Sequence, residues 1–283
     1  MEKIKILVAQ HKEAEVFHNE VYTPIHVGKS LSKTDLGILG DDTGDNISHL
    51  NPYFCELTAQ YWAWKNMHDV EYIGLCHYRR YFQTEFTTQN VEQLMNGADI
   101  VLTKSVYFSE NLYSYLSRNL VPEDIMAFFL YMKGRFRNNQ VVMDFLIKHN
   151  HFNPCNMFVC KKSLFDDFCQ WQFSILFDLF EILPKSPYVR EQRLMGYLAE
   201  LLLPMYCMSK GLKIKEISIV SMMGDNKPIL NDSPFIKFKN IIRFNLLKSK
   251  RKFTMRQDWM VGLEQNGILD MIDERVNSYE NQR

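Results

Sequence analysis

The sequence predicts an α/β protein with a mainly parallel sheet, and three observations lead to this fold class. Short apolar runs of strand length recur along the chain, and segments with helical spacing of apolar residues separate several of them. An opening strand followed directly by a polar turn is typical of α/β proteins that bind ligands at the carboxyl ends of their strands. The 283 residues, 46% of them hydrophobic, are also enough to bury one large core.

Strands and helices alternate in the first hundred residues. "IKILVA" is expected to be a buried strand, and the later "YTPIHVG" is extended because Pro24 argues against a helix. The polar stretch "GDDTGDNISHLNP" between them and the next helix is a loop, long enough to carry a function. The elements expected after it are a helix over 52–67, a strand at 71–76, a helix ending near Gly97 and a strand at 99–103.

The second half of the chain is expected to be richer in helix. The elements expected there are mostly helical and irregular structure over 105–150, a strand at 157–162, long helices at 163–183 and 190–211, and a strand at 212–220. We therefore expect two parts, a domain over 1–232 and a basic, amphipathic C-terminal segment over 233–283.

Composition and motifs exclude several classes of protein. Lys plus Arg and Asp plus Glu both number 33, so the chain has no global charge signature of nucleic-acid binding. The six cysteines are scattered without a C-x-x-C pair, the N-terminus does not read as a signal peptide, and no apolar run approaches the ~18 residues of a membrane span. These features predict a cytoplasmic location. Motifs for a P-loop, a dinucleotide-binding glycine loop and a nucleophile elbow are also missing.

The stretch "HYRRYF" follows directly on the predicted strand at 71–76. Arg79 and Arg80 would therefore lie at the carboxyl end of a strand, where open α/β sheets bind ligands. Guanidinium groups bind phosphate through a bidentate fork, so a diphosphate is the expected ligand. The alternative is that the two arginines pair with the acidic loop at Asp41 and Asp42. Tyr78 beside them could stack on a base or a sugar, or pack in the core.

Carboxylates supply the other candidate chemistry. Asp41, Asp42 and Asp45 could bind Mg²⁺ or Mn²⁺, although loops of this composition commonly form plain turns. Glu200 lies in the apolar run "GYLAELLL", where a carboxylate is either paired structurally, with Arg193 as the candidate partner, or catalytic.

The C-terminal segment is basic and amphipathic. No acidic residue occurs from Ser233 to Gln257, and apolar side chains alternate with lysines and arginines there. Residues 235–256 could dock on an anionic membrane surface, and the alternative is a solvated helix that packs on the domain.

Several long blocks together resemble a known family. They are "YTPIHVGKSLS", "DDTGDNISHLNPYFCELTAQYWAWKN", "YIGLCHYRRYF", "NMFVCKKSLFDDFCQWQFSIL" and "RLMGYLAELLL". The sequence resembles the bacterial domain-of-unknown-function family numbered 4422, from about residue 4 to residue 220. Its members lie in capsule and O-antigen gene clusters and are glycosyltransferases, some of them galactofuranosyltransferases.

The resemblance implies a GT-A-like, Rossmann-like sheet that binds a nucleotide sugar, with flanking helices and a basic helical tail. Most such enzymes hold a metal on an Asp-x-Asp motif after the central strand, whereas here that strand runs into His77, Tyr78 and Arg79. We infer that cationic side chains replace the metal, with Mn²⁺ or Mg²⁺ kept open as a cofactor. The expected roles are catalysis by Glu200, His77 or Asp42, diphosphate binding by Arg79, Arg80 and Tyr78, and a donor and acceptor pocket at Asp45, Asn46 and Asn156.

The function expected from these features is hexosyl transfer with inversion in capsule or O-antigen biosynthesis. A UDP-sugar, with galactofuranose as the candidate sugar, would donate to a lipid-linked glycan at the inner face of the cell membrane. One alternative is a non-catalytic module that binds a nucleotide or a glycan in an assembly complex, and another is a phosphotransferase that uses the same arginines.

Overall fold

The computed structural model describes residues 1–221, 233–247 and 255–280. The chain divides into two compact units. The first comprises Met1–Ser105, Asn153–Phe173 and Gln192–Leu230, and the second comprises Val106–Phe152, Ser174–Glu191 and Asn231–Arg283. The domain boundary expected at residue 232 stays a prediction.

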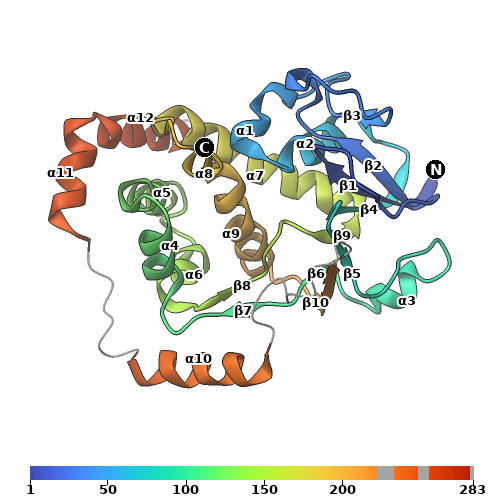
Figure 1. Ribbon diagram of the computed structural model, residues 1–283. Helices are drawn as coiled ribbons and strands as arrows, with labels where there is room; N and C mark the ends of the chain where they lie inside the picture. Colours follow the sequence, from blue (N-terminus) through green and yellow to red (C-terminus); the bar gives the residue numbers. More distant parts are fainter. Residues whose placement is uncertain (222–232, 248–254, 281–283) are drawn as a thin grey trace. The chain divides into compact units, whose positions relative to one another are not determined.

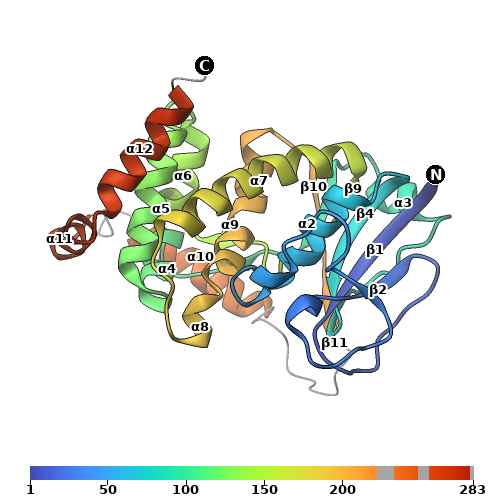
Figure 2. The ribbon, with the colours of Figure 1, turned by 90° about the horizontal axis from the view of Figure 1, so that it is seen from above.

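A large mixed sheet forms the centre of the first unit (Figures 1 and 2). Its main path runs β10-β6-β9-β4-β1-β2-β3, and β5 joins β4 to β11 beside it. The strands are β1 (Glu2–Gln10), β2 (Tyr22–His26), β3 (Leu39–Gly40), β4 (Val70–His77), β5 (Arg80–Phe82), β6 (Ile100–Thr103), β9 (Phe158–Lys161), β10 (Ile214–Ile217) and β11 (Ile219–Ser221).

One strand of the main path runs against the others. Neighbours β1, β2, β3 and β4 pair in parallel, as do β6 and β10, but β9 is antiparallel to both β4 and β6. Beside the main path, β5 is also antiparallel to both β4 and β11, so the α/β fold class is confirmed but the sheet is mixed rather than mainly parallel. Because β9 is reversed, the residues just before it lie at the carboxyl end of β4.

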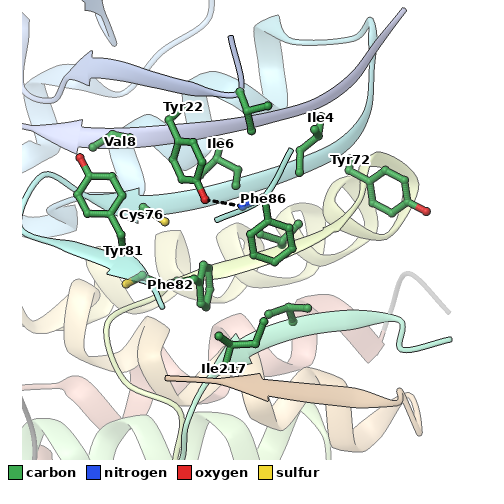
Figure 3. Close-up of a cluster of buried hydrophobic side chains, with 14 of the residues drawn as sticks. Ile4, Ile6, Val8, Tyr22, Tyr72, Cys76, Tyr81, Phe82, Phe86 and Ile217 are labelled. Carbon is green, nitrogen blue, oxygen red and sulfur yellow. Dashed lines mark hydrogen bonds between the residues drawn. The ribbon is translucent and has the colours of Figure 1, made fainter. Parts of the chain in front are cut away.

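An apolar core covers one face of this sheet (Figure 3). Alternate residues of β1, which are Ile4, Ile6 and Val8, are almost completely buried in it, as the two-residue period of a strand requires. Tyr22 from β2 lies in the same cluster, and its hydroxyl accepts a hydrogen bond of 3.0 Å from the backbone of Phe86. The core thus joins the first strands to the chain segment that follows "HYRRYF".

Gly74 lets β4 fit closely between its neighbours. A Cβ at this position would lie 2.8 Å from the Phe158 carbonyl oxygen and 2.9 Å from Val159 Cγ2. Neither atom can move without disturbing β9, so the central strand requires a residue without a side chain here.

Helices complete the first unit. One predicted helix and one predicted strand are each divided in two in the structure. They are α1 (Asn51–Phe54), α2 (Leu57–Asn66), α3 (Val91–Met95) and α9 (Leu194–Ser209), with the 3₁₀ turns η1 (Lys29–Leu31) and η2 (Ser48–Leu50). The single helix predicted over 52–67 is wrong, because Cys55 adopts φ 53° and ψ −131° and breaks it into α1 and α2. The strand predicted over 212–220 is likewise divided into β10 and β11, which pair with different neighbours.

The second unit is mainly helical. Its helices are α4 (Leu112–Asn119), α5 (Pro122–Arg135), α6 (Gln140–Lys148), α10 (Pro234–Leu247), α11 (Gln257–Gln265) and α12 (Ile268–Glu280), and a small sheet pairs β7 (Val106–Tyr107) with β8 (His151–Phe152). Helices α7 (Lys162–Ile182) and α8 (Val189–Gln192) contribute residues to both units. In the part of the chain that the structure describes, no helix is both long and apolar enough to cross a bilayer.

A buried carboxylate ties three helices of the second unit together. Asp178 on α7 pairs with Arg135 on α5 at 3.2 Å and with Arg275 on α12 at 3.3 Å. The hydroxyl groups of Tyr131 and Tyr279 also donate to it. Such a fully partnered charge can stay buried, whereas removal of one partner leaves an expensive unpaired group.

Helix α10 lies along β7 (Figure 1). Asn240 Nδ2 donates to the Tyr107 carbonyl at 2.7 Å, and Lys237 Nζ lies 4.4 Å from the centre of the Tyr107 ring. Four large apolar side chains of the same helix are exposed: Phe235, Phe238, Ile242 and Leu246. Their spacing places them in one stripe along the helix.

Candidate functional site

The "HYRRYF" stretch forms a tight turn at the carboxyl end of the central strand. β4 ends at His77, β5 begins at Arg80, and these two residues face each other in the antiparallel register. The backbone N–H of Tyr78 donates to the Ala9 carbonyl at 3.0 Å, so the turn lies beside the end of β1. The turn is therefore at the sheet edge where open α/β proteins bind ligands.

The segment before β9 completes this edge through two strained residues. Cys155 and Asn156 have φ angles of 77° and 50°, in a region that residues other than glycine rarely adopt. His77 Nε2 lies 2.6 Å from the Cys155 carbonyl oxygen, which can only accept, so the imidazole carries a proton on Nε2. Consecutive strained residues cluster at functional sites, and here they fix the orientation of the histidine.

Glu56 is held beside His77 and was not expected from the sequence. Asn156 Nδ2 donates to Glu56 Oε1 at 2.7 Å and to the Gly196 carbonyl at 3.1 Å. His77 Nε2 lies 3.9 Å from the same Glu56 oxygen. Asn156 Oδ1 is buried, and among the described residues it has no hydrogen-bond partner. An unsatisfied buried acceptor at this position indicates a place where a ligand could donate.

Glu200 is the second carboxylate of the cluster. Burial raises its pKa to about 8, and the negative charge of Glu56 contributes in the same direction. The backbone N–H of Cys155 and the nearby Arg80 and Arg193 act against this shift. Glu200 is thus mostly protonated at neutral pH, because burial disfavours its charged form and the charge of Glu56 acts in the same direction.

Three arginines approach the same edge. Arg80 Nη1 lies 3.6 Å from Cys155 Sγ, and Arg193 Nε donates to Cys55 Sγ at 3.2 Å. Arg79 is exposed, and its guanidinium lies 5.1 Å from the centre of the Tyr78 ring. This concentration of cationic groups suits an anionic ligand.

His11, just after β1, lies near some of the same cations. Burial lowers its pKa, and the charges of Lys12, Arg79 and Arg193 lower it further. The Tyr78 ring packs edge-on against it at 5.3 Å. The region between the ends of β1 and β4 is therefore electropositive.

The two cysteines of the cluster do not supply a nucleophile. Burial raises the pKa of Cys55 to about 11 and that of Cys155 to about 12, so both remain thiols at neutral pH. Since the thiolate is the reactive form, the chemistry of the site rests on the carboxylates and the cations.

Four of the site residues predicted from the sequence are brought together here. His77, Arg80, Asn156 and Glu200 come from three sequence blocks and lie around the Cys155 peptide. The sequence did not indicate Glu56, because the helical pattern continues through it. A signal was nevertheless present at Asn51, whose side chain donates to the Cys55 carbonyl at 2.8 Å and caps the break.

The acidic loop makes its own contacts instead. Asp41 is fully buried and accepts hydrogen bonds from the backbone of Gly28 and Lys29 and from the Ser48 hydroxyl. These bonds attach the loop to the end of β2, and within the described residues Asp41 does not form the alternative pairing with Arg79 and Arg80. Asp42 Oδ1 is buried without a partner among the described residues, and a catalytic role for Asp42 stays a prediction.

Asp45 attaches the loop to α2, and Asn46 bonds within the loop. The Tyr61 hydroxyl donates to Asp45 Oδ1 at 3.1 Å, and the Asn46 amide donates to the Gly44 carbonyl at 3.0 Å. In the described ranges no group of three His, Cys, Asp or Glu side chains could hold a metal ion. The use of Mn²⁺ or Mg²⁺, and of the loop carboxylates as its ligands, stays a prediction.

Two further buried side chains end the neighbouring strands β1 and β2. Gln10 and His26 face each other in the parallel register and are 5% and 1% exposed, so neither is a surface group. Gln10 Oε1 and both ring nitrogens of His26 have no hydrogen-bond partner in the part of the chain that is described. The pair was not predicted as part of the site, because in the sequence it is marked by nothing more than its position at the ends of two strands.

The fold and the charged cluster define a GT-A-like α/β protein with its site at the carboxyl edge of the sheet. The chain belongs to the family described as a domain of unknown function, DUF4422, whose model matches residues 5–211. The resemblance noted from the sequence is thereby confirmed. No protein with a curated description matches the chain.

A solved structure supports the same fold. It is described as the apo structure of WbbM, a bifunctional glycosyltransferase, and it matches with 30% sequence identity and a TM-score of 0.71. The match covers 77% of this chain and 45% of that chain, so this protein spans less than half of WbbM. The GT-A-like fold class is therefore confirmed.

Proposed function

We propose that this protein is a glycosyltransferase of surface polysaccharide biosynthesis. It transfers a hexosyl group, with galactofuranose as the candidate, from a UDP-sugar to a lipid-linked glycan of capsule or O-antigen, with inversion at the anomeric carbon. One observation carries the proposal: two carboxylates, Glu56 and Glu200, lie among His77, Arg80 and Arg193 at the carboxyl edge of a GT-A-like sheet. The glycosyltransferase description of WbbM supports it.

The arginines suit the leaving group of this reaction. When the bond between sugar and diphosphate breaks, negative charge develops on the nucleoside diphosphate, and fixed cations stabilise it most in a site that excludes water. Arg80 is partly buried beside Cys155, whereas Arg79 is exposed next to Tyr78. We assign Arg80 to the diphosphate at the bond that breaks, and Arg79 with Tyr78 to the outer part of the donor.

The unsatisfied atoms at the ends of β1 and β2 suit a nucleobase. A uracil ring offers one N–H donor and two carbonyl acceptors. Gln10 Oε1 can accept from that donor, and a protonated ring nitrogen of His26 can donate to a carbonyl. This complementarity supports a uridine nucleotide as the donor.

Calorimetric titration with UDP tests the donor site. Binding is expected both with Mn²⁺ and with EDTA, and it should be lost in Arg80→Ala. Product mass after incubation with UDP-hexoses and a lipid-linked acceptor then separates glycosyl transfer from phosphoryl transfer. Failure to bind UDP under either condition contradicts the proposal and favours a different ligand or a non-catalytic module.

Helix α10 suits attachment to the inner face of the cell membrane, where a lipid-linked acceptor resides. Its exposed stripe includes Phe235, which is 74% exposed, and Leu246, which is 72% exposed. Lys239 and Arg243 come from the same helix, and no acidic residue occurs in it. Aromatic and aliphatic side chains flanked by cations bind the boundary of anionic bilayers. Part of the segment predicted to dock, 248–254, lies outside the described residues.

Vesicle co-sedimentation tests this attachment. Vesicles with phosphatidylglycerol should retain the wild type, and a Phe238→Ser and Leu246→Ser double variant should be released while its turnover on a soluble acceptor is preserved. Val189→Ser serves as the matched control, because Val189 is 76% exposed but lies outside α10. Equal retention of the double variant and the wild type would exclude α10 as the docking surface.

A further inference from the structure

Glu56 occupies a position that the chain constructs at some energetic cost. The backbone of Cys55 leaves the helical region, with φ 53°, so that Glu56 starts the ten-residue helix α2 rather than continuing α1. A residue other than glycine at such a φ is strained, and strain of this kind persists where the surrounding structure requires it. The break turns Glu56 toward Asn156 and His77.

We propose that Glu56 is the general base that deprotonates the acceptor hydroxyl. This assignment rests on the glycosyltransferase function proposed above and gives Glu56 the role that the sequence suggested for Glu200, His77 or Asp42. Its side chain is 11% exposed, so it is sheltered but reachable. Oε1 is held by Asn156, and within the described residues Oε2 accepts no hydrogen bond, which leaves it to receive a proton.

Groups that attract negative charge or donate hydrogen bonds surround the Glu56 carboxylate. The positive end of the α2 dipole lies at Glu56, and His77 Nε2 is 3.9 Å from its carboxylate. Arg193, which contacts the neighbouring Cys55, adds a further positive charge.

Glu200 and His77 are less suited to the same role. Glu200 faces Glu56, Arg80, Arg193 and the Cys155 backbone, and its pKa of about 8 keeps it mostly protonated at neutral pH. His77 Nε2, the ring nitrogen that lies 3.9 Å from Glu56, donates to the Cys155 carbonyl and so cannot accept a proton there. Glu56 is instead held by Asn156 through Oε1 with its side chain still reachable, so the geometry assigns the base to Glu56.

The proposed transfer is a single displacement at the anomeric carbon. The acceptor oxygen attacks the anomeric carbon and forms the new glycosidic bond, and its proton passes to Glu56 Oε2. The bond between the anomeric carbon and the β-phosphate oxygen breaks at the same time, and its electron pair leaves with UDP beside Arg80. Glu56 then releases the proton to solvent.

Steady-state kinetics of two isosteric variants tests the assignment at neutral pH. Glu56→Gln is expected to lower kcat by about 10²–10⁴-fold, the usual contribution of a general base, while the Kd for UDP changes by less than about threefold. Glu200→Gln resembles the protonated carboxyl and should lose less than about tenfold. Formate should restore part of the turnover of Glu56→Ala, which a structural role would not allow.

Controls distinguish a wrong assignment of Glu56 from a failure of the proposed glycosyltransferase function. Glu92→Gln makes the same change in α3, where Glu92 pairs with Lys3 at the surface, and should leave kcat unchanged. If Glu56→Gln remains within tenfold of the wild type, or if Glu200→Gln loses more than Glu56→Gln, Glu56 is not the base. If the wild type itself neither binds UDP nor transfers any hexose, the proposed function fails and this inference fails with it.

Discussion

Asn156 Nδ2 donates a hydrogen bond of 2.7 Å to Glu56 Oε1, across 100 residues of sequence. The same nitrogen donates to the Gly196 carbonyl on α9 at 3.1 Å. One buried amide thus connects the start of α2, the segment before β9 and the helix that carries Glu200. The candidate site depends on how these three segments meet rather than on any one motif.

Replacement of Asn156 by alanine should loosen this junction. Glu56 would lose the donor that holds Oε1. Position 156 has φ 50°, a backbone conformation that asparagine tolerates better than alanine does. We expect turnover to fall by about 10- to 100-fold and the free energy of unfolding to fall by about 1–3 kcal/mol. Kinetics combined with urea denaturation measures both, and a stable variant with unchanged turnover would contradict the proposed role of the amide.

The sequence predicted most of the strands along the chain and four residues of the cluster, for a physical reason. A buried strand followed at once by "HYRRYF" can only place its charges at the strand end, so Arg80 and His77 were identifiable from pattern alone. Glu200 was also identifiable, because a carboxylate within an apolar helix needs an explanation.

Glu56 was not identifiable, because its position depends on a backbone dihedral. The apolar period of "PYFCELTAQYWAWKN" runs through Cys55 without a glycine or proline to mark the break. The antiparallel direction of β9 was equally hidden, since strand direction is set by pairing with β4 and β6. The periodicity of apolar residues along the chain indicates neither the break at Cys55 nor the direction of β9.

The two arginines of the turn should differ in importance. Arg80 contacts Cys155 and lies near Glu200, whereas Arg79 is exposed. We expect Arg80→Ala to lower turnover by about 10²-fold or more, as loss of a charge-stabilising donor does, and Arg79→Ala to have a smaller effect. Arg80→Lys keeps the charge but loses the planar fork, so it should recover only part of the activity. Turnover of both alanine variants within a few-fold of the wild type would remove the arginines from the mechanism.

Stability should depend on pH through Glu200. Burial raises its pKa from the ordinary value of 4.5 to about 8, so the folded state binds the proton more tightly than the unfolded chain does. This contribution to stability is fully present below pH 4.5 and is lost as the pH rises to about 8. Glu200→Gln removes the ionisable group, so the stability of the variant relative to the wild type should increase over this range, by roughly 2–4 kcal/mol.

Urea denaturation at a series of pH values measures this difference between Glu200→Gln and the wild type. Buffers between pH 4.5 and 8.5 cover the window in which the two proteins should diverge. Glu92→Gln again provides the control, because that carboxylate is paired with Lys3 at the surface. A constant difference between Glu200→Gln and the wild type across the window would mean that Glu200 is ionised in the folded state.

Asp178 should be essential to the second unit. It is 5% exposed, and Asp178→Ala would leave Arg135 on α5 buried without its anionic partner. Breaking a buried ion pair from one side costs about 3–5 kcal/mol, and this value is our expectation for the free energy of unfolding. Asp270→Ala on the exposed side of α12 is the matched control and should change stability by less than about 0.5 kcal/mol. Urea denaturation monitored by circular dichroism compares the two variants, and equal stability would mean that solvent, rather than Asp178, satisfies Arg135.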